Sequence, residues 1–158
     1  MSALLEVREL RTSFRTDDGI VKAVDGVSFS VEKGKTLGIV GESGCGKSTM
    51  ARCLMRLLDP TSGRITFAGR DITHLNRTEM RPIRRELMMI FQDPYASLNQ
   101  RKRVGFIVAE ALQVHKIGTP VEIKRRVQEL LDVVGLNPEH YNRFPHCLLY
   151  TSDAADDL

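Results

Sequence analysis

Hydrophobic and polar positions change their period along the chain, and the changes predict strands first and helices later. Apolar residues alternate with polar ones over Leu4–Phe14, and β-branched residues form two short runs within Ile20–Val31, broken by Asp25-Gly26. Continuous apolar runs at Thr36–Val40 and Leu87–Phe91 are typical of strands buried on both faces of a sheet. The first hundred residues are therefore expected to be rich in strands.

Helical periods appear in three further places. Apolar residues with the spacing i, i+3, i+4, i+7 and i+8 predict a first helix over Lys47–Leu58, and Arg64–Ala68 then predicts another strand. Asn76 and Thr119 are each followed by a glutamate three residues later, which predicts capping boxes. The apolar stripe of the first later helix comprises Val104, Ile107, Val108, Ala111 and Leu112, and that of the second comprises Val127, Leu130, Leu131 and Val134.

A glycine-rich segment links the strand at Thr36–Val40 to the first helix. It reads Gly41, Glu42, Ser43, Gly44, Cys45, Gly46, Lys47, Ser48 and Thr49, the pattern G-x-x-x-x-G-K-[ST] of a phosphate-binding loop. Backbone N–H groups of such a loop and of the helix start favour an anion, Lys47 would reach the outer phosphates, and Ser48 would bind Mg²⁺. The alternative is a glycine-rich turn with a surface lysine, and the flanking strand and helix favour the binding site.

Composition narrows the possible classes of protein. The 158 residues are 42% hydrophobic and 27% charged, which indicates a globular chain of one domain. A net charge of +3 is too small to indicate nucleic-acid binding by itself. Three basic clusters are interpreted as solvated faces, and a surface that faces membrane lipids or a partner is the second interpretation. These clusters are Arg81/Arg84/Arg85, Arg101/Lys102/Arg103 and Lys124/Arg125/Arg126. Three scattered cysteines fit a reducing cytosol, and neither a membrane span nor a secretion signal is expected.

Two segments together resemble a known family. Gly41–Thr49 and Met89–Asn99, which reads MIFQDPYASLN, are similar to the ATP-binding subunit of ABC transporters, in particular the dipeptide and oligopeptide importer group. The resemblance extends over about Leu4–His146 and implies an α/β fold. That fold has a P-loop NTPase (RecA-like) core, an N-terminal antiparallel β subdomain and the start of the ABC helical subdomain.

The resemblance implies roles for single residues. All nine residues from Gly41 to Thr49 would bind ATP as the Walker A loop, with Lys47 also counted as catalytic. Gln92 matches the Q-loop glutamine, which would help to hold Mg²⁺ beside Ser48 and position the attacking water. Phe14 matches the aromatic residue that stacks on adenine. Taken alone, Gln92 would be an ordinary loop residue and Phe14 a core residue.

The family also implies a function and partners. The intact protein would be an ATPase subunit that couples ATP hydrolysis to peptide uptake. It would pair head-to-tail with a second ATP-binding subunit, dock on transmembrane permease subunits at the cytoplasmic side of the plasma (inner) membrane, and serve a solute-binding protein indirectly. No nucleic-acid partner is expected. The alternatives are a non-catalytic nucleotide-binding fragment and a soluble ABC ATPase that acts on nucleic acid.

The match to the family stops after His146. The Ser-Gly-Gly-Gln signature, the Walker B carboxylates and the switch histidine of the family do not occur in the sequence, so we expect an incomplete domain. Residues 1–100 would form the β subdomain and P-loop core, and 101–146 the start of the helical subdomain. Residues 147–158 resemble a translated sequencing adapter, and the alternative is a divergent natural C-terminus.

Overall fold

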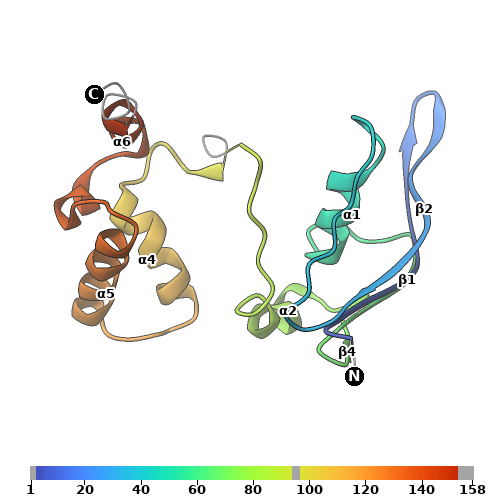
Figure 1. Ribbon diagram of the computed structural model, residues 1–158, viewed down its shortest axis with the longest axis horizontal. Coiled ribbons are helices and arrows are strands. Elements are labelled where there is room, and N and C mark those ends of the chain that lie inside the picture. Colours follow the sequence, from blue (N-terminus) through green and yellow to red (C-terminus); the bar gives the residue numbers. More distant parts are fainter. Residues whose placement is uncertain (1–2, 94–96, 153–158) are drawn as a thin grey trace. The chain divides into compact units, whose positions relative to one another are not determined.

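The computed structural model describes residues 3–93 and 97–152. Three residues of the family-like segment, at 94–96, and the final six residues of the tail lie outside the described residues. The chain divides into two units, Met1–Ile90 and Phe91–Leu158, which Figure 1 shows in blue to green and in yellow to red.

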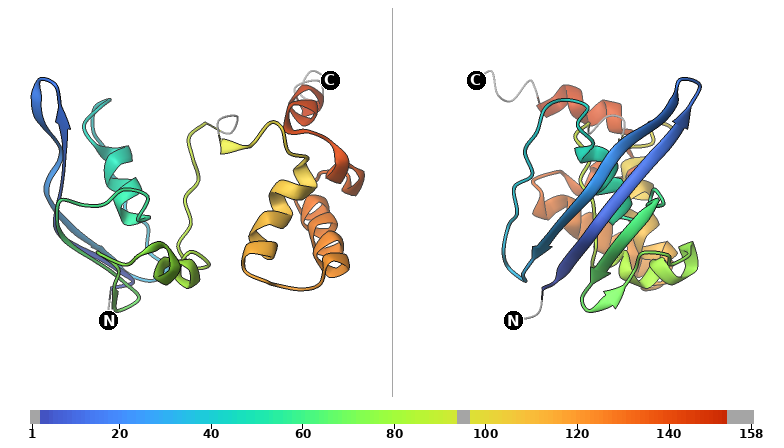
Figure 2. Two further views of the ribbon diagram at one scale, coloured as in Figure 1. Left: turned by 180° about the vertical axis from the view of Figure 1, so that it is seen from behind. Right: turned by 90° about the vertical axis from the view of Figure 1, so that its right-hand side faces the viewer.

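The first unit is built on an antiparallel sheet of four strands (Figure 2). The long strands β1 (Leu5–Thr16) and β2 (Gly19–Val31) form a hairpin, and β1 is the strand that the alternating pattern predicts. On its other edge, β1 pairs with β3 (Ser62–Phe67), and β3 pairs with the short β4 (Arg70–Asp71). The resulting order is β2-β1-β3-β4. This antiparallel sheet confirms the expected β subdomain within a mixed α/β fold.

The predicted break in the second strand is a bulge in one continuous strand. Leu10 pairs with Val27 and Arg11 with Asp25, which leaves Gly26 as the extra residue, at a φ of 74°. Glycine adopts this left-handed conformation without steric cost, so the hairpin absorbs the irregularity and continues. The break at Asp25-Gly26 in the sequence pattern therefore corresponds to this bulge, and the strand is continuous.

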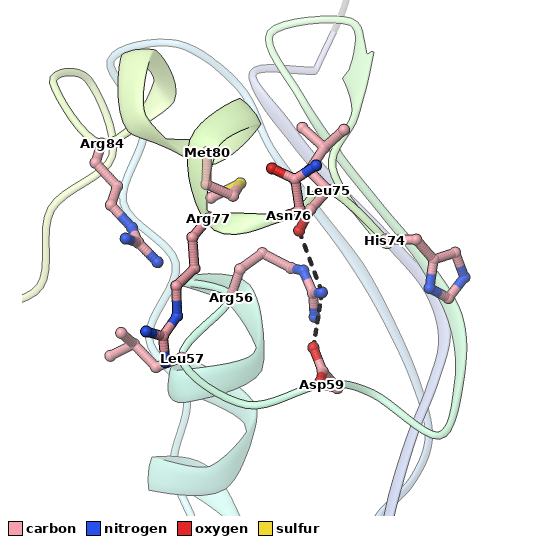
Figure 3. Close-up of a pocket in the computed structure, with 9 residues that line it drawn as sticks. All are labelled: Arg56, Leu57, Asp59, His74, Leu75, Asn76, Arg77, Met80 and Arg84. Atoms are coloured by element: carbon pink, nitrogen blue, oxygen red, sulfur yellow. Dashed lines mark hydrogen bonds and ion pairs between the residues drawn. The ribbon is translucent and has the colours of Figure 1, made fainter.

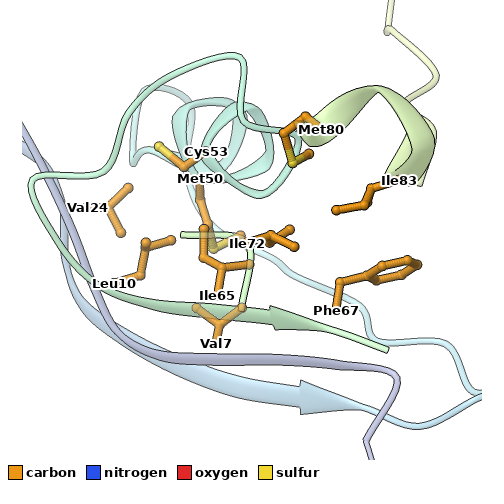
Figure 4. Packing of buried hydrophobic residues seen from close by; sticks show 10 residues of the cluster. All are labelled: Val7, Leu10, Val24, Met50, Cys53, Ile65, Phe67, Ile72, Met80 and Ile83. Atoms are coloured by element: carbon orange, nitrogen blue, oxygen red, sulfur yellow. The ribbon is translucent and has the colours of Figure 1, made fainter. Parts of the chain in front are cut away.

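Two helices cover one face of the sheet. Figure 4 shows α1 (Lys47–Leu54) and α2 (Arg77–Ile83) placing apolar side chains against those of the strands. The buried cluster comprises Val7, Leu10, Val24, Met50, Cys53, Ile65, Phe67, Ile72, Met80 and Ile83. Helix α2 begins with the predicted capping box, because the Asn76 side chain accepts from the N–H of Glu79 while the Glu79 carboxylate accepts from the N–H of Asn76.

The first helix ends earlier than predicted. It stops at Leu54 rather than Leu58, because Arg56 adopts a left-handed backbone conformation with a φ of 51°. The N–H of Leu57 then donates to the carbonyl of Arg52, and the N–H of Arg56 to that of Cys53, which is the hydrogen-bond pattern of a Schellman cap. Glycine is usual at this position, so an arginine gives no sequence signal for the end of the helix.

The two predicted buried strands, Thr36–Val40 and Leu87–Phe91, were wrong. Both segments lack regular structure, and they expose apolar side chains such as Val40, at 96%, and Ile90, at 97%. A strand needs a neighbour for its N–H and C=O groups, and neither segment pairs with any strand among the described residues. The apolar pattern alone could not supply that neighbour.

The second unit is helical and has its own small core. Helices α4 (Val104–Val114) and α5 (Pro120–Val133) pack together, followed by the 3-10 helix η1 (Pro138–Asn142) and α6 (Pro145–Ser152). Thr119 and Glu122 form the predicted capping box of α5, and the hydrogen bonds from Thr119 lower the pKa of the Glu122 carboxyl. Val134, predicted on the buried stripe, is 68% exposed. Across the described parts of both units, every helix is too short or too polar to cross a bilayer.

Candidate functional site

The predicted phosphate loop lies directly before α1. Residues 41–46 have no regular structure, and the helix starts at Lys47, as the pattern predicts. Gly44 and Gly46 have φ angles of 81° and 94°, a region that other residues rarely adopt. Gly46 is the N-cap and has no side chain to cap the helix, so the helix start remains open to an external acceptor.

A bulge in β2 brings the sheet against this loop. Thr12 pairs with Val24 and Ser13 with Lys22, so Ala23 is the extra residue on β2. A Cβ atom built on Gly46 would fall on the carbonyl oxygen of Ala23, far inside the distance that two such atoms tolerate. Gly46 is therefore required by close backbone approach as well as by its dihedral angles. The sequence pattern identified Gly46 but gave no sign of Ala23, because the bulge depends on the pairing of two strands.

The side chain of Lys47 reaches back across the phosphate loop. Its Nζ donates to the carbonyl oxygen of Gly41 at 2.8 Å and to that of Glu42 at 2.6 Å, and it lies 3.4 Å from the Sγ of Cys45. The ammonium group is thus held over the inside of the loop by backbone acceptors. A phosphate that entered the loop would meet a positive charge already in position.

The start of α1 offers donors that fit an anion. The backbone N–H groups of Lys47, Ser48 and Thr49 donate to no acceptor among the described residues, and the first internal bond of the helix runs from the N–H of Met50 to the carbonyl of Gly46. Ser48 is exposed beside them, where its hydroxyl is free to reach a cation. Unpaired N–H groups, the positive end of the helix dipole and Lys47 together suit a phosphate chain with its metal.

Phe14 lies in the same unit as the loop. It pairs with Val21 across the hairpin and is 38% exposed, so part of its ring is open to solvent. Val21 precedes Ala23 by two residues, which is about 7 Å along a strand, and Ala23 contacts the loop at Gly46. The hairpin therefore brings an exposed aromatic ring and the phosphate loop to the same region of the sheet.

The remaining predicted site residues differ in their exposure and in the unit to which they belong. Glu42, Ser43 and Cys45 are exposed on the loop, and Thr49 is half-buried on the first turn of α1. Gln92 is exposed and lies in the second unit, two residues after the division at Ile90. Its role beside Mg²⁺ stays a prediction.

The close approach of Gly46 to Ala23 leads to a first testable prediction. Gly46→Ala adds a left-handed alanine, at about 1–2 kcal/mol, and an overlap with Ala23 that costs about 1–3 kcal/mol more. Gly44→Ala is the matched control, because Gly44 also has a positive φ but faces open space. We expect the free energy of unfolding, measured in urea by circular dichroism, to fall further for Gly46→Ala. Equal losses in the two variants would contradict the backbone contact.

Comparison with known proteins agrees with this geometry. The profile of the ABC transporter family matches residues 24–148. The chain is 51% identical over 145 residues to the oligopeptide transport ATP-binding protein OppF of Bacillus subtilis, covering 90% of this chain and 48% of that protein. It is 43% identical over 152 residues to the di/tripeptide transport ATP-binding protein DppF of Pseudomonas aeruginosa. That match covers 92% of this chain and 47% of DppF. The chain thus spans about half the length of the curated relatives it matches.

Solved structures show the same fold. The structure of MJ0796, a bacterial ABC transporter cassette, superposes with a TM-score of 0.76 at 24% identity, covering 90% of this chain and 62% of that one. The structure of cbiO1 from Clostridium perfringens, part of the ABC transporter complex cbiONQ, gives a TM-score of 0.67 at 28% identity. That match covers 93% of this chain and 56% of cbiO1. The resemblance seen in the sequence is confirmed, and the chain belongs to the ABC transporter family.

Proposed function

We propose that the protein containing this chain is the ATP-binding subunit of an ABC importer that takes up peptides. The proposal rests on the phosphate loop, where Lys47 bonds to two loop carbonyls and the N–H groups of residues 47–49 have no acceptor in the part of the chain that the structure describes. The 51% identity to an oligopeptide transport protein supports peptides as the transported class. Docking at the cytoplasmic face of the membrane, on permease subunits and beside a second ATP-binding subunit, completes the proposal.

Each site residue then has a defined task. Lys47 exchanges its bonds to the loop carbonyls for bonds to the outer phosphates, and the N–H groups of residues 47–49 hold the phosphate chain. Ser48 would hold Mg²⁺ through its hydroxyl. The resemblance to the family alone supports a role for Gln92 in holding Mg²⁺ and in positioning the attacking water. Bound there, Mg²⁺ would supply positive charge against the transferred phosphoryl group. Phe14 stacks on adenine, at about 1–3 kcal/mol.

The transported class can be tested with the full-length protein. We expect a tagged form to sediment with membranes that contain its permease, and to support ATP-dependent uptake of a labelled tripeptide into vesicles. Lys47→Ala provides the control that keeps the partners and removes the ATP-dependent step. Uptake of nickel in place of the tripeptide would contradict the proposed substrate. Co-purification with nucleic acid, without membranes, would contradict the importer function and favour a soluble ABC ATPase.

A further inference from the structure

A polar cavity lies in the first unit, at the far end of α1 from the phosphate loop. It has a volume of about 740 Å³ and lies between the end of α1, the segment after β4 and helix α2 (Figure 3). Lys47 and the cavity are separated by the whole of α1, whose eight residues span about 12 Å. The volume falls in the range of small-molecule sites.

Arginine side chains dominate the charge of this cavity. Arg56, Arg77 and Arg84 line it, and among the described residues of its lining only Asp59 carries a carboxylate. Asp59 pairs with Arg56 at 2.7 Å. The guanidinium groups of Arg77 and Arg84 have no hydrogen bond or ion pair with any of the described residues. The cavity therefore keeps two uncompensated positive charges.

The two uncompensated arginines come from one side of α2. Arg77 is the first residue of the helix and Arg84 is its C-cap, so they are seven residues, or about two turns, apart. Residues at this spacing lie on the same face. Figure 3 shows both side chains beside Met80, on the side of the cavity that α2 forms.

Arg56 gives an independent reason to expect a ligand. Its side chain is only 8% exposed, and its Nε–H is buried without an acceptor among the described residues. Its other nitrogens donate to the carbonyl oxygen of Leu58 at 3.3 Å and to that of Leu75 at 3.5 Å. Arg56 also occupies the left-handed cap position where glycine would be less strained. A buried unpaired donor and a strained backbone both cost free energy, and such costs gather at ligand sites.

We propose that Arg56, Arg77 and Arg84 form a binding site for a small soluble molecule that carries phosphate. Guanidinium groups match phosphate oxygens through paired hydrogen bonds, which makes arginine the preferred residue for this anion. The site is separate from the ATP loop and would respond to a second phosphorylated compound.

Pyrophosphate is the probe for the test, and the full chain with Lys47→Ala is the background, because that change weakens phosphate binding at the ATP loop. We expect equilibrium dialysis with labelled pyrophosphate to show binding that falls at least tenfold in Arg77→Ala/Arg84→Ala. Lys33→Ala/Arg70→Ala is the matched control, since it removes the same charge from exposed positions outside the cavity. That control should change the dissociation constant less than twofold.

Two further measurements test the role of Arg56 and distinguish a soluble ligand from a lipid headgroup. Arg56→Gly suits the left-handed backbone but removes the guanidinium group, so it should also lose pyrophosphate, and unchanged binding would overturn the proposal. Vesicles of phosphatidylglycerol should not retain the chain in a manner that depends on Arg77 and Arg84. Retention of that kind without pyrophosphate binding would identify a lipid headgroup and overturn the soluble ligand. Equal losses in the two double variants would overturn it as well, because diffuse charge would then explain the binding.

Discussion

Lys47→Ala is expected to weaken ATP binding roughly 30- to 150-fold. The ammonium group lies over the loop, bonded to the carbonyl oxygens of Gly41 and Glu42, where it would meet the outer phosphates. Hydrogen bonds to charged groups contribute about 1.5–3 kcal/mol, and about 2–3 kcal/mol converts to that loss of affinity. Titration calorimetry of the full chain with Mg-ATP measures the dissociation constant directly.

A matched control separates the role of Lys47 from a general loss of positive charge. Lys35→Ala removes one exposed lysine from the same unit, outside the loop, and should leave the affinity within about twofold. Substituting Lys47 also removes two hydrogen bonds to the carbonyl oxygens of the loop, so circular dichroism of the variant should first show an unchanged fold. An affinity for ATP within threefold of the original would contradict the assignment of Lys47 to the outer phosphates.

Local signals in the sequence predicted local structure well. The capping boxes at Asn76 and Thr119 formed as expected, because each needs only a glutamate three residues later. The strand β1 followed from the alternation of apolar and polar residues over Leu4–Phe14. These features depend on neighbours in the chain, and a single sequence contains those neighbours.

Features that depend on distant partners could not be predicted in the same way. The apolar runs at Thr36–Val40 and Leu87–Phe91 have the composition of buried strands, but a strand forms only when another strand pairs with it. The contact of Gly46 with Ala23 likewise depends on a bulge that pairing with β1 creates. The sequence therefore predicted the residues of the phosphate loop and missed the part of the sheet that supports it.

The arginines of the cavity also show the difference between neighbours in the chain and partners that are distant in the sequence. The sequence marks Arg81, Arg84 and Arg85 as one basic cluster, interpreted as a solvated face. The structure instead groups Arg84 with Arg77, two turns away on α2, and with Arg56 from the end of α1. Spacing along a helix could have linked Arg77 to Arg84, whereas no signal in the sequence links either of them to Arg56.

Ile65→Ala is expected to destabilise the first unit by about 2–5 kcal/mol, the usual cost of removing a large aliphatic side chain from a core. Ile65 is fully buried on β3, where it pairs with Val7, and Figure 4 shows it beneath α1, close to Met50 and Ile72. Small domains are stable by only about 5–15 kcal/mol in total. Since α1 and the phosphate loop rest on this core, ATP binding should fall together with the unfolding midpoint in urea.

Ile90→Ala is the control that makes this prediction informative. The substitution is chemically identical and lies in the same unit, but Ile90 is 97% exposed, so the free energy of unfolding should change by less than about 0.5 kcal/mol. Urea titrations of both variants, followed by circular dichroism, give the two values under the same conditions. A similar loss in both variants would mean that Leu87–Phe91 is buried in solution, as its apolar pattern first indicated, and would contradict the exposed course of this segment. A large loss for Ile65→Ala alone would support the burial of Ile65 in the core that includes Met50 of α1.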